Sequence, residues 1–171
     1  MKKIICTLLA LLMVLPLTAC TNKKKEIKAP VTFYYRTREI ELGIDESVIS
    51  SEQRESYGHT EDYIYITEMY LNGPTTGKCI SPFPAGTKLD SLDFVQDKVL
   101  VVLSSHISLL SGAELSLACV CLSKTLLELT GKKSVQIRAK DDLLDGKESI
   151  TIAAKNYQLE DDTLTFMDDA Q

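Results

Sequence analysis

Apolar positions near the start of the expected domain alternate with polar ones. Val31–Arg36 follows this period of two and is rich in β-branched and aromatic residues, so it predicts a strand. Residues 37–58 show no sustained pattern. We expect a short strand or loop there, followed by an irregular polar segment.

Residues 60–71 carry two competing patterns. Their tyrosines and isoleucines have high strand propensity. However, Tyr63, Ile66 and Tyr70 fall on one face of a helix. Asn72-Gly73-Pro74 follows directly and is typical of the end of a helix, which favours the helical interpretation.

The next segment contains prolines and then two apolar runs. Residues 80–86 include Ser-Pro-Phe-Pro-Ala-Gly, which predicts an extended turn. Residues 88–95 and 98–104 predict a hairpin that turns at Gln96-Asp97. The second of these strands is apolar on both faces, so we expect it to lie inside a sheet rather than at an edge.

Ser108–Leu129 has the clearest helical pattern of the chain. Its apolar residues cluster within a narrow arc of the helix, and Gly131 is placed to cap the C-terminus. Ser134–Lys140 then alternates as a strand. Ile150–Ala153 predicts a last strand at the edge of the sheet.

The N-terminus has the parts of a bacterial lipoprotein signal. Lys2 and Lys3 precede the apolar run Ile4–Leu17, which is shorter than the roughly 20 residues of a membrane-spanning helix. Leu17-Thr18-Ala19-Cys20 resembles the lipobox, whose cysteine takes a diacylglycerol and becomes the new N-terminus. We therefore predict lipidation at Cys20. An ordinary signal peptide with an incidental cysteine is the alternative.

These features divide the chain into four parts. They are a signal peptide (1–19), a lipidated tether (20–30), a domain (31–155) and an acidic C-terminal tail (156–171). Lys23-Lys24-Lys25 in the tether either approaches anionic headgroups or is a solvated linker. A diacylated or triacylated Cys20 would hold the protein on the extracytoplasmic face of the cell membrane.

The charge of the mature chain argues against nucleic acid as a partner. Removing residues 1–19 lowers Lys+Arg from 19 to 17, because Lys2 and Lys3 are lost, and leaves all 24 Asp+Glu. An acidic domain lacks the basic face that a phosphate backbone requires. The remaining length suits one domain with one core.

Catalytic groups are sparse in the sequence. The two histidines, His59 and His106, lie in separate polar loops. Either would need a cysteine such as Cys79 beside it to form a nucleophile pair, and no spacing suggests one. The sequence also contains no glycine-rich phosphate-binding loop. We therefore predict no catalytic site and no cofactor.

Three cysteines remain in the domain once Cys20 is lipidated. Cys119 and Cys121 lie two positions apart on the predicted helix, so their side chains point in nearly opposite directions. This geometry disfavours both a shared zinc ion and a disulfide between them. We expect Cys119 in the core and Cys121 on a less buried side. The sequence leaves open whether Cys79 and Cys121 form a disulfide.

Two further clusters have simpler explanations than ligand binding. Asp141, Asp142 and Asp145 lack the alternating spacing of an EF-hand calcium loop, so we expect a solvated loop and no metal site. The tyrosines could stack against a sugar, but packing between helix and sheet explains most of them. They are Tyr34, Tyr35, Tyr63, Tyr65 and Tyr70.

Five short motifs follow one another along the domain. They are Tyr70-Leu71-Asn72-Gly73-Pro74, Ser81–Leu89 (SPFPAGTKL), Val101-Val102-Leu103-Ser104, Thr125-Leu126 and Val135-Gln136-Ile137. Their order and spacing, over residues 31–153, resemble the GerM-type (GerMN) domain of sporulation and spore-germination lipoproteins.

The resemblance implies an α/β (α+β) two-layer sandwich that is similar to ring-building motifs. Two helices would cover one face of a mixed sheet, in the order β-α-β-β-α-β. The resemblance also implies a non-enzymatic role in sporulation, spore germination or the assembly of another envelope complex. The sporulation proteins carry two such domains in tandem, whereas this chain has room for one.

We therefore expect a membrane-tethered interaction module that binds itself or another envelope protein. Gly112, Ser116 and Ser123 share a helix face that would allow close approach of a neighbour. The alternative is an accessory lipoprotein that binds a small ligand or a cell-wall fragment. A pocket lined by the tyrosines would favour this alternative, and a closed core would count against it.

Overall fold

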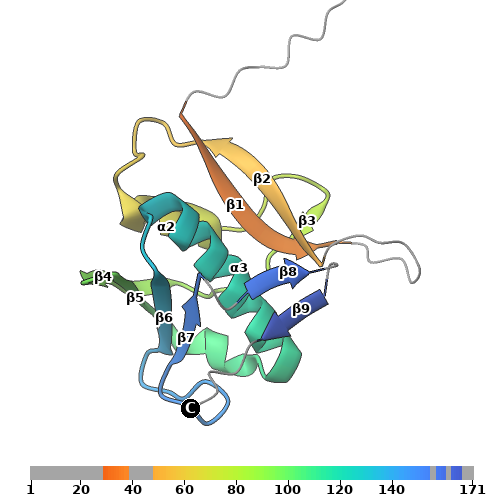
Figure 1. Cartoon of the computed structure of the whole chain (residues 1–171), viewed down its shortest axis with the longest axis vertical. Helices are drawn as coiled ribbons and strands as arrows, with labels where there is room; N and C mark the ends of the chain where they lie inside the picture. Colours follow the sequence, from red (N-terminus) through yellow and green to blue (C-terminus); the bar gives the residue numbers. More distant parts are fainter. Residues whose placement is uncertain (1–28, 39–47, 155–156, 161–162, 167–171) are drawn as a thin grey trace, which may run out of the picture.

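The computed structural model describes residues 29–38, 48–154, 157–160 and 163–166 (Figure 1). The elements in chain order are β1 (Pro30–Thr37), β2 (Ile49–Glu55), α2 (Tyr63–Leu71), β3 (Cys79–Ile80), β4 (Leu89–Val95), β5 (Lys98–Leu103), the 3-10 helix η1 (Ser105–Leu109), α3 (Gly112–Thr130), β6 (Ser134–Ala139), β7 (Ile150–Ala153), β8 (Tyr157–Glu160) and β9 (Thr163–Phe166). The predicted α+β class is confirmed. Most of the strands are divided between two sheets, which the sequence pattern did not reveal.

The first sheet has the order β2-β1-β3 and is antiparallel throughout. β1 lies in the middle and confirms the predicted strand. Val31, Phe33 and Tyr35 point into the core, as their alternation predicts. The register places Arg36 of β1 opposite Ile80 of β3. The C-terminal end of β1 is therefore brought close to the segment that follows β3.

β2 corrects the expectation of an irregular polar segment. Ile49 is the only apolar residue of this strand, and the inward-facing position opposite Phe33 of β1 is taken by Glu52, which is 5% exposed. Because a buried charge replaces an apolar side chain, the hydropathy pattern hides the strand. The Glu52 carboxylate accepts hydrogen bonds from the backbone N–H groups of Thr75 and Thr76 at 2.9–3.1 Å.

Arg54 completes a polar cluster that ties β2 to the end of α2. Its Nε lies 3.2 Å from Glu52 Oε1, and its guanidinium lies 4.1 Å from the centre of the Phe33 ring. Its two terminal nitrogens donate to the carbonyls of Met69 at 3.0 Å and Gly73 at 3.2 Å. The helix stop at Gly73, which has a φ of +90°, is therefore held against the first sheet.

The second sheet is mixed and has the order β4-β5-β6-β7. β4 and β5 form the predicted hairpin, and Gln96 takes a φ of +53° in its turn. β5 lies inside the sheet, as its two apolar faces predicted. β5 and β6 run parallel, so a long connection must cross between them, and α3 supplies it. β7 is an edge strand, as expected.

α3 lies between the two sheets and contacts β1 of the first sheet and β6 and β7 of the second (Figure 1). Thr125 joins the helix to β1 directly. Its Oγ1 accepts the N–H of Tyr34 at 3.0 Å and donates to the carbonyl of Cys121 at 3.0 Å. Gly131 caps the helix with a φ of +65°, which confirms the predicted C-terminus.

The helix predicted over residues 108–129 begins later than expected. η1 ends at Leu109, Leu110 is extended, and α3 starts at Gly112. Ile107 is fully buried in η1, so apolar residues continue through the break between the two helices. Periodicity alone therefore cannot locate this break.

α2 confirms the helical interpretation of residues 60–71. Asp62 caps its N-terminus by accepting the N–H of Tyr65 at 3.0 Å. Ile66 and Tyr70 are buried on the face that the spacing predicted. α2 packs against β4 of the second sheet.

The segment expected to be an acidic tail contains two strands. β8 and β9 pair in antiparallel fashion, with Tyr157 opposite Phe166. Both strands fall within residues 156–171, so this segment is not wholly irregular. The expected signal peptide lies outside the described residues, and the division into four parts stays a prediction.

Candidate functional site

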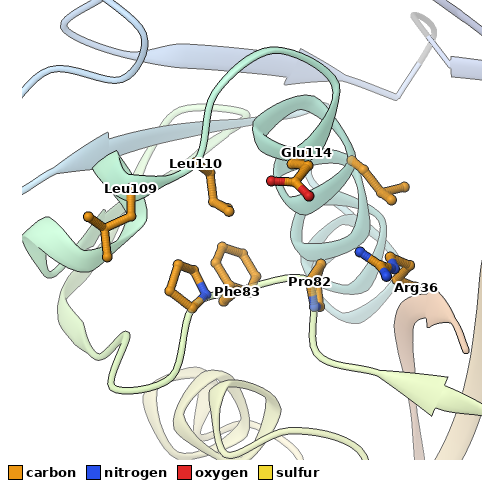
Figure 2. A pocket seen from close by; sticks show the side chains of 8 residues that line it. Arg36, Pro82, Phe83, Leu109, Leu110 and Glu114 are labelled. Carbon is orange, nitrogen blue, oxygen red and sulfur yellow. The ribbon is translucent and has the colours of Figure 1, made fainter.

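An open groove lies between the turn after β3 and the start of α3 (Figure 2). Its volume is about 300 Å³. Its lining consists of Arg36, Pro82, Phe83, Pro84, Leu109, Leu110, Glu114 and Leu117. One wall thus belongs to the Ser81–Leu89 motif, and the other belongs to η1 and α3. Folding alone brings these walls together.

Hydrogen bonds within the proline-rich wall hold it in one shape. Ser81 Oγ accepts the N–H of Phe83 at 3.2 Å, and Thr87 Oγ1 donates to the carbonyl of Pro84 at 2.9 Å. The prolines fix φ on either side of Phe83. This wall is therefore already shaped before any partner binds.

Phe83 forms the floor of the groove and is only 7% exposed. Its ring meets Tyr70 edge-on, with 6.1 Å between ring centres. Tyr70 in turn stacks on Tyr35 at 4.7 Å. The aromatic core thus supports the floor from beneath.

The opposite wall carries an apolar side chain into solvent. Ile107 is fully buried and anchors η1, whereas Leu109 is 76% exposed. The N–H of Leu110 donates to the carbonyl of Ile107 at 3.0 Å, which fixes the end of η1. An exposed leucine that borders an apolar groove is typical of a contact surface.

Two charged side chains lie at the end of the groove away from Leu109 (Figure 2). Arg36 comes from β1, and Glu114 comes from the first turn of α3, where the helix dipole favours a negative charge. Among the ion pairs of the described residues, none includes either side chain. Both charges are therefore available to a partner.

The groove has room for one side chain of another protein. Its volume of about 300 Å³ is at the lower end for small-molecule sites, which span about 300–1,000 Å³. The floor is apolar, and the charges are confined to one end. A leucine-sized group next to a charged residue fits this chemistry.

The candidate catalytic residues are not assembled into a site. His59 Nδ1 lies 3.7 Å from Asp62 Oδ2, at the start of α2. His106 Nδ1 lies 3.4 Å from Ser104 Oγ, and His106 also packs so closely on Gly86 that a Cβ there would lie 3.3 Å from Nε2. In the hydrogen bonds, ion pairs and ring contacts of the described residues, neither histidine meets a cysteine.

The three domain cysteines are buried free thiols, so Cys79 and Cys121 are not bonded to each other. Cys119 lies in the core as predicted. The expectation that Cys121 is less buried is wrong, because the first sheet covers that side of α3 and leaves Cys121 with 0% exposure. Burial raises the pKa of both helix thiols to about 12. Within the described part of the chain, no group of three or more His, Cys, Asp or Glu residues is placed to hold a metal ion.

The buried tyrosines form a closed core rather than a sugar-binding patch. Tyr35 Oη donates to the carbonyl of Tyr70 at 2.9 Å, and Tyr70 Oη donates to the carbonyl of Tyr34 at 2.8 Å. Burial raises the pKa of the Tyr35 and Tyr70 hydroxyls well above their usual value. This arrangement counts against the ligand-binding alternative.

The small-residue face predicted on α3 is open only at its start. Gly112 is exposed, and Ser116 Oγ donates to the Gly112 carbonyl at 3.0 Å. Ser123, farther along, is fully buried within the molecule. This face is therefore not a continuous surface for a neighbouring element.

Sequence patterns did not single out most of the groove. Arg36 occupies an ordinary polar position in an alternating strand, and Leu109 appeared to belong to the long helix. The Ser81–Leu89 motif was the one signal that pointed to this region, because it carried part of the family resemblance.

The fold and the groove define a small α+β domain with an open apolar surface. A family model described as "Germane: Sporulation and spore germination" matches residues 32–145, which is more than half of the chain. The chain therefore belongs to the Germane family, and the resemblance to GerM-type domains is confirmed.

Two solved structures are similar to the chain. The tandem GerMN domains of the sporulation protein GerM from Bacillus subtilis match with 18% identity and a TM-score of 0.53, over 74% of this chain and 47% of that one. A candidate lipoprotein from Clostridium perfringens matches with 14% identity and a TM-score of 0.46, over 74% of this chain and 89% of that one. The chain thus spans about half the length of the GerM structure. No curated protein matches the sequence.

Cys20 lies outside the described residues, so its lipidation stays a prediction. Among the helices that the structure describes, none has the length and apolar character needed to cross a membrane.

Proposed function

We propose that this protein is a lipid-anchored extracytoplasmic protein whose Germane domain binds an envelope protein or a second copy of itself. In this proposal the domain catalyses no reaction and acts in sporulation, spore germination or another envelope complex. Membership of the Germane family supports the link to spore formation. The observation that carries the binding role is the open groove, in which Leu109 is 76% exposed beside an apolar floor.

The proposed anchor follows from the lipobox at Leu17-Thr18-Ala19-Cys20 and the polar tether after it. Acyl chains on Cys20 would keep the domain within reach of the membrane surface. Confinement raises the effective concentration of partners on the same membrane, so a weak contact at the groove is sufficient.

The GerM structure from Bacillus subtilis is described as tandem GerMN domains, and this chain covers 47% of it. In the proposed function, a domain on a separate chain takes the place of the second domain. The partner is then either another envelope protein or a further copy of this chain.

Fatty-acid labelling tests the anchor. Cells grown with an alkyne-bearing fatty acid should label the wild-type protein, and Cys20→Ala should lose the label because the thiol that takes the lipid is missing. Cys6→Ala is the matched control, since Cys6 lies within the apolar run of the signal. A label that persists in Cys20→Ala would show that the assigned lipidation site is wrong.

Capture from intact cells tests the binding role. The full-length protein is crosslinked in cells and purified, and the attached proteins are identified by mass spectrometry. We expect the wild type to capture an envelope protein or itself, and Leu109→Asp to capture much less. Val95→Asp is the control, because Val95 is 50% exposed but lies outside the groove. If the wild type captures neither, the proposed function is wrong.

A further inference from the structure

A loop between β6 and β7 presents the kind of group that the groove accepts. Leu143 in this loop is 50% exposed, whereas the next residue, Leu144, is fully buried. Leu144 and Lys147 exchange two backbone hydrogen bonds, of 2.8 and 3.0 Å. The N–H of Leu143 donates to Asp142 Oδ1 at 2.8 Å. The loop is thus anchored, so docking Leu143 costs little conformational entropy.

The charges of this loop complement those of the groove. Asp142 precedes Leu143, and Lys147 follows it. In the described part of the chain neither side chain takes part in an ion pair. The groove offers the opposite charges, on Arg36 and Glu114. Insertion of Leu143 would bring Asp142 toward Arg36 and Lys147 toward Glu114.

The loop does not fill the groove of its own chain, because Leu143 is not part of the groove lining. The loop instead adjoins the start of α3, where Asp145 Oδ2 accepts the N–H of Gly112 at 3.5 Å. The groove and the loop therefore lie near the same helix terminus. In a two-fold dimer each copy would give its loop to the groove of the other.

We propose that a second copy of this chain docks at the groove by inserting Leu143 between Leu109 and Phe83, with Asp142 paired to Arg36. This inference rests on the proposed function and specifies the partner within it. One loop in a groove of about 300 Å³ is a small contact, whereas stable interfaces bury about 1,200–2,000 Å². The association therefore depends on confinement at the membrane, which the anchor on Cys20 provides.

Photo-crosslinking of the full-length protein in membranes tests this contact. A benzoylphenylalanine probe replaces Leu143, and a second version carries the probe at Leu109. Copies with and without heavy-isotope label are mixed, so that links between two chains can be told from links within one. We expect the Leu143 probe to join residues 81–84 or 109–117 of a second copy. A probe at Val95, which is equally exposed at 50%, should not reach the groove.

A charge exchange tests the ion pair. Arg36→Glu and Asp142→Arg should each lower the yield of the link between two copies by about fivefold, since exposed ion pairs are worth that much in affinity. The double variant restores the pair in reverse order and should recover the yield. Recovery would also show that the single variants are folded.

The results separate this inference from the function on which it rests. Links between two copies that ignore both charge changes, or that avoid the groove, overturn the proposed contact. Links from both probes only to another envelope protein also overturn it, but they support the proposed function. If neither probe joins any protein, both the contact and the proposed function are wrong.

Discussion

At the residue scale, the pairing of Glu52 with Arg54 decides how the segment after α2 is placed. Taking both charges out of water is costly, and their attraction compensates only when hydrogen bonds satisfy the remaining atoms. Backbone N–H groups of residues 75 and 76 and two carbonyls supply those bonds. The side chains of Glu52 and Arg54 are only 2% and 13% exposed.

Replacing either Glu52 or Arg54 alone should therefore lower the stability of the protein strongly. We expect Glu52→Gln to lower the free energy of unfolding by about 3–5 kcal/mol, because it leaves the Arg54 charge buried without a counter-charge. Urea unfolding measures this change. Asp97→Asn is the control, because Asp97 pairs with Lys133 at a site where the two side chains are 63% and 80% exposed. It should leave the free energy of unfolding nearly unchanged, because water screens an ion pair at such an exposed site. Equal effects of the two variants would contradict this account.

At the scale of elements, α3 is a helix covered by one sheet on each of two sides. The consequence is clearest at Cys119 and Cys121, which point in different directions and are both fully buried. An amphipathic helix on one sheet would have left one of them near solvent. Burial instead holds both thiols in the protonated form and raises their pKa from 9.0 to about 12.

This shift predicts a loss of stability in alkaline solution. Above pH 9 the unfolded chain loses the two thiol protons while the folded chain keeps them until about pH 12. The stabilisation is therefore complete below pH 9 and declines above it, by at most about 1.4 kcal/mol per pH unit for each thiol. Urea unfolding between about pH 8 and pH 9.5 measures the slope, a range in which most tyrosines in the unfolded chain are still protonated because their ordinary pKa is about 10.

The variant Cys119→Ala/Cys121→Ala provides the comparison. Its stability should be lower at every pH because cavities form in the core. Its slope above pH 9 should nevertheless be shallower than that of the wild type. An unchanged slope would mean that these thiols do not titrate differently in the folded and unfolded chain.

At the scale of the whole molecule, α3 joins the two sheets into one core. Residues from β1, α3, β5 and β6 belong to a single buried cluster. The hydrogen bond from Tyr34 to Thr125 adds a direct link between the first sheet and the helix. Separating either sheet from α3 would therefore expose apolar surface of that sheet and of the helix.

A cavity in α3 should weaken both sheets together. We expect Leu122→Ala, at a fully buried position, to lower stability by about 2–5 kcal/mol. Hydrogen exchange should show that β1 and β2 lose protection at the same denaturant concentration as β5 and β6. Leu143→Ala, at a position that is 50% exposed, should change stability by less than about 0.5 kcal/mol. Two separate transitions would show that the sheets unfold independently.

The groove is also a product of the whole molecule. The walls of the groove come from segments around residues 36, 82 and 109, which are far apart in the chain. The pairing of Arg36 with Ile80 across β1 and β3 brings the first two together. The burial of Ile107 and the late start of α3 place Leu109 opposite them. No local pattern contains this information.

Taken alone, the sequence determined the elements whose signals are local. β1 and β5 follow from alternation and apolar runs, the ends of α2 and α3 follow from Gly73 and Gly131, and the motif order indicated the Germane family. These features depend on neighbouring residues along the chain, and a sequence displays such neighbours directly.

Only the tertiary structure decided the rest. β2 exists because backbone N–H groups of residues 75 and 76 satisfy Glu52 in a position where an apolar residue was expected, and Cys121 is buried because the first sheet covers that side of α3. The groove exists because three distant segments meet. In each case the deciding partner lies far away in the chain, so the residue's own neighbours carry no trace of it.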